Sequence, residues 1–202
     1  MRRELDYIRI EDALGGNQEW LPERDMNRGG CGAVTACDLC IYLARQRGLR
    51  SLYPYDADRL TKEDFIGFAS IMKPYLSPRS TGIDRLDIYL DGLSGYWRDA
   101  GNASLGAAGF PGTAPFEEAE ALARAQIDGG MPIPYLLLRH QNKAFEDFEW
   151  HWFNLTGYEE REDGLLVDAV TYGEPHWLNF RELWDTGEER RGGMIRVFEH
   201  HP

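Results

Sequence analysis

Apolar and polar residues alternate with two different periods along the 202-residue chain. In the segment 31–47, apolar residues recur at intervals of three and four, which is the period of a helix with one buried face. The segment begins at Cys31, and Gly48 closes it, as glycine commonly does after a helix. The pattern therefore predicts a helix that begins at Cys31. Its apolar positions are Val34, Cys37, Ile41 and Ala44.

Three further helices are expected in the first half of the chain. Thr61 is a favourable N-cap residue, and the apolar positions after it predict a helix that ends before Pro74. Two more helices are expected over residues 83–99 and 116–127. The segment 101–115 between them is rich in glycine and alanine, and we interpret it as a loop.

The second half of the chain consists of short apolar or aromatic runs separated by polar or glycine-containing turns, a pattern typical of antiparallel strands. Helices first and strands second predict an α+β fold, in which a helical half packs against an antiparallel sheet. We expect one domain over residues 1–202, with an irregular lead-in at 1–30, a helical half at 31–128 and a sheet half at 129–202. The predicted strands are 132–138, 150–158, 164–171 and 194–198, with a short helix at 179–184.

Charge and cysteine content narrow the class of protein. The chain carries 22 basic and 34 acidic residues, a net charge of −12, without a basic stripe, so we expect no nucleic-acid partner and no membrane partner. Neither a secretory signal nor a run of about 18 apolar residues is found. The three cysteines all fall within residues 31–40, which is not the spacing of a disulfide scaffold. We therefore expect a cytoplasmic protein with reduced thiols.

Cys31 is the strongest candidate for chemistry. It lies between Gly30 and Gly32, where a loop turns into the predicted helix. The helix dipole and the free backbone N–H groups at a helix start favour thiolate over thiol, and the flanking glycines allow a substrate backbone to approach. The alternative is a small buried cysteine in a glycine turn, which is the more usual role of a free cysteine.

A nucleophilic thiol needs a base, and His151 is the histidine best placed for that role, at the start of an aromatic strand. Asp168, inside the next apolar strand, is the candidate acceptor that would orient the imidazole. Each residue also has a purely structural interpretation. His151 is consistent with a core histidine whose ring nitrogens are hydrogen-bonded, and Asp168 is consistent with a solvated residue on an edge strand.

The order Cys, His, Asp, on a helix start and two late strands, resembles the papain-like cysteine peptidase fold. The resemblance is closest to the bacterial branch related to the bacteriocin-leader-processing peptidases, and it spans residues 17–198. It implies that Cys31 is the nucleophile, His151 the general base and Asp168 the orienting residue. The motifs that carry the resemblance are Gly30-Cys31-Gly32-Ala33-Val34-Thr35-Ala36, His151-Trp-Phe-Asn-Leu-Thr-Gly-Tyr158, Val167-Asp168, Tyr172-Gly173 and Phe180-Arg-Glu-Leu-Trp184.

The same family takes an oxyanion donor from a glutamine shortly before the cysteine, whereas this chain has Arg24 and Asp25 in that stretch. The nearest amides are Gln18 and Asn27, and we favour Gln18. Together these residues predict a cysteine peptidase or amidase that forms an acyl-enzyme with a peptide or small amide substrate.

Three alternatives to hydrolysis stay open from the sequence. The first is a catalytically inactive member of the same fold that binds a peptide or protein, and the second is a thiol acyltransferase. The third is a metal site at Cys37 and Cys40, which have a ligand spacing but fall one turn apart inside the apolar helix, so we interpret them as packing residues. No cofactor and no metal are implied, and the oligomeric state is left undetermined.

Overall fold

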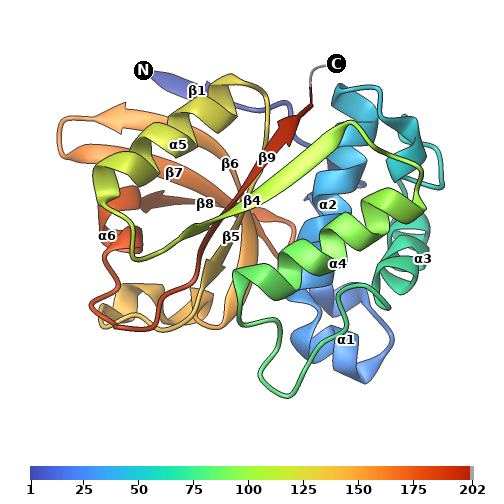
Figure 1. The fold of residues 1–202 in the computed structure, drawn as a ribbon, viewed down its shortest axis with the longest axis horizontal. Helices are drawn as coiled ribbons and strands as arrows, with labels where there is room; N and C mark the ends of the chain where they lie inside the picture. Colours follow the sequence, from blue (N-terminus) through green and yellow to red (C-terminus); the bar gives the residue numbers. More distant parts are fainter. Residues whose placement is uncertain (201–202) are drawn as a thin grey trace.

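The computed structural model describes residues 1–200 and is an α+β arrangement of helices and one large antiparallel sheet. Figure 1 shows the helices of the first half, α1 to α4, gathered on one side of the sheet, with α5 and α6 on the other side. The bounds of these helices are α1 Arg24–Gly29, α2 Cys31–Gln46, α3 Lys62–Met72, α4 Leu86–Asp99, α5 Phe116–Asp128 and α6 Phe180–Trp184.

The helices α2 to α6 lie where the sequence pattern predicts them. The helix α2 begins at Cys31 as predicted, and Gly48 after its end has a positive φ of 70°. Thr61 caps α3, since its Oγ1 accepts a hydrogen bond from the backbone N–H of Asp64 at 3.1 Å. No helix among residues 1–200 combines the length and hydrophobicity that crossing a bilayer requires.

The main sheet has seven strands in the order β4-β9-β5-β6-β7-β8, with the short strand β1 paired to β6 outside this path. All the pairings are antiparallel. The strands β2 and β3 form a separate two-stranded sheet. The strand bounds are β1 Arg2–Glu4, β2 Arg9–Ile10, β3 Ala13–Leu14, β4 Leu105–Pro111, β5 Ile133–Leu137, β6 His151–Arg161, β7 Gly164–Thr171, β8 Glu174–Asn179 and β9 Gly193–Glu199.

Three segments depart from the sequence prediction. The expected loop at 101–115 contains β4, which pairs with β9 along its whole length, because backbone pairing overrides a weak side-chain pattern of glycine and alanine. The lead-in at 1–30 is not irregular, since it contains three short strands, a 3-10 helix at Gln18–Trp20 and α1. The strand β8 lies in a polar segment for which the sequence predicted no strand, and it forms the sheet edge next to β7.

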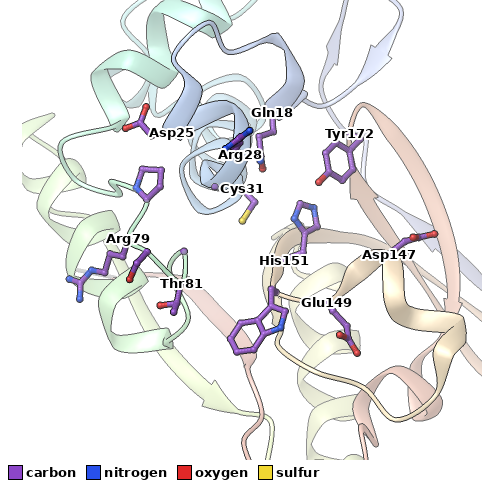
Figure 2. Close-up of a pocket in the computed structure, with 15 residues that line it drawn as sticks. Gln18, Asp25, Arg28, Cys31, Arg79, Thr81, Asp147, Glu149, His151 and Tyr172 are labelled. Carbon is purple, nitrogen blue, oxygen red and sulfur yellow. The ribbon is translucent and has the colours of Figure 1, made fainter.

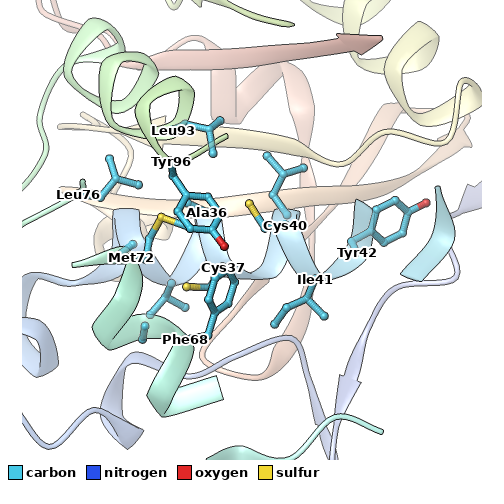
Figure 3. Packing of buried hydrophobic residues seen from close by; sticks show 14 of the residues in the cluster. Ala36, Cys37, Cys40, Ile41, Tyr42, Phe68, Met72, Leu76, Leu93 and Tyr96 are labelled. Atoms are coloured by element: carbon cyan, nitrogen blue, oxygen red, sulfur yellow. The ribbon is translucent and has the colours of Figure 1, made fainter. Parts of the chain in front are cut away.

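The helix α2 runs through the centre of the larger hydrophobic core. Every residue from Cys31 to Ala44 is buried, and α2 packs against β6 and α3. Cys37 and Cys40 have no exposed surface and lie among apolar side chains, which is the packing role expected for them. Figure 3 shows these neighbours, which include Phe68, Met72, Leu76, Leu93 and Tyr96.

Candidate functional site

Three segments that are far apart in sequence bring Gln18, Cys31 and His151 to one cavity of about 840 Å³. Gln18 comes from the 3-10 helix of the lead-in, Cys31 from the start of α2 and His151 from the start of β6. Figure 2 shows the sulfur of Cys31 and the imidazole of His151 directed into the same space. The cavity therefore unites three of the four residues that the sequence singled out.

Cys31 is held at a sharp junction between two helices. The helix α1 ends at Gly29 and α2 begins at Cys31, so the chain changes direction at Gly30. A Cβ atom at Gly30 would overlap the carbonyl oxygen of Met26, one turn earlier in the chain, so this turn requires glycine. Cys31 is 7% exposed and lines the cavity.

The electrostatic state of Cys31 differs from the sequence expectation. Burial raises the pKa of the Cys31 thiol, and it outweighs the nearby backbone N–H groups of Trp152, Gly32 and Cys31 itself, which act in the opposite direction. The helix start favours the thiolate as expected, yet desolvation decides the balance. In the resting protein Cys31 is a neutral thiol at neutral pH.

The imidazole of His151 is fixed by two neighbours from the end of β7. Its Nε2 lies 2.6 Å from the hydroxyl Oγ1 of Thr171. Its ring stacks on that of Tyr172, with centroids 4.9 Å apart and planes 2° from parallel. Burial lowers the pKa of His151 to about 4, so the imidazole is neutral at neutral pH.

The residue before His151 is held in an unusual backbone conformation. Trp150 has a φ of 53°, in the left-handed region that bulky residues rarely adopt, and its N–H donates to the carbonyl of Leu138 at 2.8 Å. Its indole is 42% exposed and lines the cavity beside His151. Strained residues of this kind cluster at functional sites, where the surrounding structure holds them in place.

Asp168 does not reach His151, which corrects the predicted triad. On β7 it pairs with Gly157 of β6, six residues beyond His151 and roughly 20 Å along the strand at about 3.3 Å per residue. Its Oδ2 instead accepts a hydrogen bond from the hydroxyl of Thr156 at 2.9 Å. The partner of the His151 ring is Thr171, a residue that the sequence analysis did not single out.

Of the two candidate amides, Gln18 lines the cavity and Asn27 does not. The side-chain nitrogen of Asn27 donates to the carbonyls of Glu19 and Leu21, so this residue holds the lead-in together. The nitrogen of Gln18 donates to the carbonyl of Asn27 at 2.8 Å and carries a second N–H. Gln18 is 6% exposed, and its Oε1 is buried without a hydrogen-bond partner among the described residues.

Charged side chains line both walls of the cavity. Asp25, Arg28 and Arg79 lie on the wall formed by α1 and the loop before α4, whereas Asp147 and Glu149 lie on the wall beside His151. Figure 2 shows these side chains, with Cys31 and His151 between the two walls. Among residues 1–200, no group of three or more His, Cys, Asp or Glu side chains is arranged to hold a metal ion.

Comparison with known proteins adds no assignment, since no protein-family model, no curated protein and no solved structure matches this chain.

Proposed function

We propose that this protein is a cysteine-type hydrolase that cleaves an amide or thioester bond through an acyl-enzyme. Cys31 is the nucleophile, His151 the general base and Gln18 an oxyanion donor. The observation that carries the proposal is the convergence of these three side chains, from three distant segments, on one cavity of about 840 Å³. A neutral thiol beside a neutral imidazole is a competent starting state, because the base removes the proton as the nucleophile attacks.

In the proposed reaction His151 uses Nδ1, because Nε2 is bound to Thr171. Nδ1 takes the proton of Cys31 as the sulfur forms a bond to the carbonyl carbon of the substrate. The tetrahedral intermediate collapses when the imidazolium gives that proton to the leaving amine or thiolate, which leaves an acyl group on Cys31. Water, deprotonated by His151, then releases the acid and regenerates the thiol.

The oxyanion has two donors within the proposed site. The backbone N–H of Cys31 lies at the start of α2, in the first turn, where N–H groups lack helical partners. The second N–H of Gln18 provides the other donor. Loss of one such donor costs about 100- to 1000-fold in the rate of the chemical step in well-studied hydrolases.

The arrangement of helix start and late strands supports the papain-like fold as the finer description of this α+β protein. The site departs from the family pattern at one position, because a threonine hydroxyl takes the place of the residue that orients the base. A hydroxyl fixes the orientation of the ring but gives the imidazolium less support than a carboxylate does. We therefore expect a slow enzyme.

The test is acylation of the full-length protein by p-nitrophenyl acetate, with the modified residue identified by mass spectrometry. We expect an acetyl group on Cys31 and its loss in Cys31→Ser, with the rate lowered at least tenfold in His151→Ala. Cys37→Ala is the matched control and retains the wild-type rate, because Cys37 lies fully inside the core. Acetylation of lysines only, or an unchanged rate in His151→Ala, would refute the proposal.

A second candidate is a catalytically inactive protein that binds a peptide in the same cavity. The observation that favours it is the absence of a carboxylate partner for His151, whose ring nitrogen faces Thr171 among the described residues. Alkylation with iodoacetamide separates the two candidates. An activated Cys31 reacts much faster in the wild type than in His151→Ala, whereas an inactive site gives equal rates.

A further inference from the structure

A buried polar network lies directly behind the candidate site, and Asp38 is its centre. Asp38 is on α2, seven residues after Cys31 and therefore on the same face of the helix, and it is 3% exposed. No salt bridge of Asp38 is found among residues 1–200. A buried carboxyl group without an ion-pair partner costs free energy, so the residue is a poor choice for stability alone.

The first contact of Asp38 is with the segment that carries Gln18. Its Oδ1 accepts the backbone N–H of Gly16 at 2.8 Å. Gly15, with a φ of +73°, lies so close that a Cβ atom there would be 2.5 Å from Asp38 Oδ2. The chain is thus drawn against α2 two residues before Gln18 enters the cavity.

The second contact leads to the other two site residues. The hydroxyl of Tyr7 lies 3.5 Å from Asp38 Oδ2 and accepts a hydrogen bond from the Asn154 side chain at 2.9 Å. The same Asn154 nitrogen lies 3.1 Å from the carbonyl of Thr35, and the hydroxyl of Thr35 donates to the carbonyl of Cys31 at 2.7 Å. Asn154 lies on β6 three residues after His151, so the network joins β6 to the first turns of α2.

A second, small cavity of about 10 Å³ connects this network to the site. Gln18, Cys31 and His151 line it together with Asp38 and Asn154. Two buried acceptors, Oε1 of Gln18 and Oδ1 of Asn154, lack hydrogen-bond partners among the described residues. Residues of the network and of the candidate site therefore line the same small cavity.

We infer that Asp38 is a positioning residue that sets the Gln18 amide against Cys31, by clamping Gly15 and Gly16 onto α2. The inference rests on the proposed function, because it assigns the clamp to the oxyanion donor of that reaction. Asp38 touches no reacting atom. It acts through its hydrogen bond with the Gly16 N–H. The hydrogen bonds of Tyr7 and Asn154 fix the position of this contact relative to β6.

The test measures acylation by p-nitrophenyl acetate and alkylation by iodoacetamide in the same variants. Alkylation at a saturated carbon forms no oxyanion, so it reports on Cys31 and His151 without Gln18. Asp38→Leu removes the acceptor of the Gly16 N–H, and we expect acylation to fall at least tenfold while alkylation changes less than about threefold. Asp38→Asn keeps an acceptor at the same place and restores most of the acylation rate.

A double-mutant cycle separates positioning from a general loss of structure. Gln18→Ala lowers acylation as Asp38→Leu does, and the double variant shows no further loss, because both changes remove one donor. Asp168→Leu is the matched control, a buried carboxyl group on β7 away from the cavity, and leaves acylation unchanged. Full additivity of Asp38→Leu and Gln18→Ala would overturn the inference.

Two further measurements keep the inference testable when a variant or the reaction fails. If Asp38→Leu does not fold, Gly15→Ala disturbs the same contact from the other side. We expect the same result for it, a fall in acylation with little change in alkylation. If the wild type is not acylated, the proposed function is refuted. NMR then tests the contact between Asp38 and the Gly16 segment independently of activity. We then expect Asp38→Leu, but not Asp168→Leu, to shift the side-chain amide of Gln18 and to lower the hydrogen-exchange protection of Gly16. Unchanged signals for both residues would overturn the clamp.

Discussion

Replacing Asp38 by asparagine changes how the stability of the protein depends on pH. Burial raises the pKa of Asp38 from 3.8 to about 7, although the Gly16 N–H and the Tyr7 hydroxyl act in the opposite direction. Between those two values the folded protein holds a proton that the unfolded chain has lost. The free energy of unfolding therefore falls as pH rises from about 4 to about 7, and the contribution is fully present only below the unfolded pKa.

The magnitude follows from the pKa difference. At about 1.36 kcal/mol for each pKa unit, a rise from 3.8 to about 7 corresponds to about 4 kcal/mol. The titratable groups that face Asp38 are Tyr7, Cys37 and Tyr89, and burial raises the pKa of each. All three stay neutral through this range, so they add no opposing slope.

His151 contributes with the opposite sign over nearly the same range. Its pKa is lowered from 6.5 to about 4, so the unfolded chain binds a proton there that the folded protein does not. The free energy of unfolding rises with pH from about 4 to 6.5, by about 3 kcal/mol. In the wild type the contributions of Asp38 and His151 to the free energy of unfolding nearly cancel. Their sum therefore changes little between about pH 4 and pH 6.5.

The assay is urea unfolding followed by tryptophan fluorescence at several pH values from 4.5 to 7.5. Relative to the wild type, Asp38→Asn gains stability as pH rises, and His151→Gln loses stability as pH rises. Asp163→Asn, in an exposed turn, is the control and runs parallel to the wild type. A difference between Asp38→Asn and the wild type that does not change with pH would refute the raised pKa and the sign derived from it.

Three further changes test the geometry around the site. Thr171→Val removes the hydroxyl that holds His151, and we expect acylation of Cys31 by p-nitrophenyl acetate to fall about tenfold, while Thr171→Ser retains most of it. Tyr172→Ala uncovers the imidazole, so the pKa of His151 measured by NMR titration rises from about 4 toward 6.5. Gly30→Ala places a Cβ atom against the carbonyl oxygen of Met26 and lowers the free energy of unfolding in urea by about 1–3 kcal/mol, and a wild-type value would refute this close contact.

The sequence predicted the elements that depend on local pattern and failed where long-range pairing decides. The helix α2 was predictable, because its apolar period, its start at Cys31 and its closing Gly48 all act over a few residues. The strand β4 was not, because a run of glycine and alanine has little preference of its own and becomes a strand by pairing with β9. The convergence of Gln18 with Cys31 likewise depends on contacts across the chain, through Asp38 and Gly16.

The register that separates Asp168 from His151 is set locally by the hairpin of β6 and β7. Arg161 pairs with Gly164 across a two-residue turn, and counting back along both strands puts Asp168 opposite Gly157. An acceptor for His151 must then come from the far end of β7, where Thr171 lies. The carboxylate of Asp168 is chemically the better partner for an imidazole. In an antiparallel hairpin, however, the number of residues from the turn determines which side chains lie opposite each other.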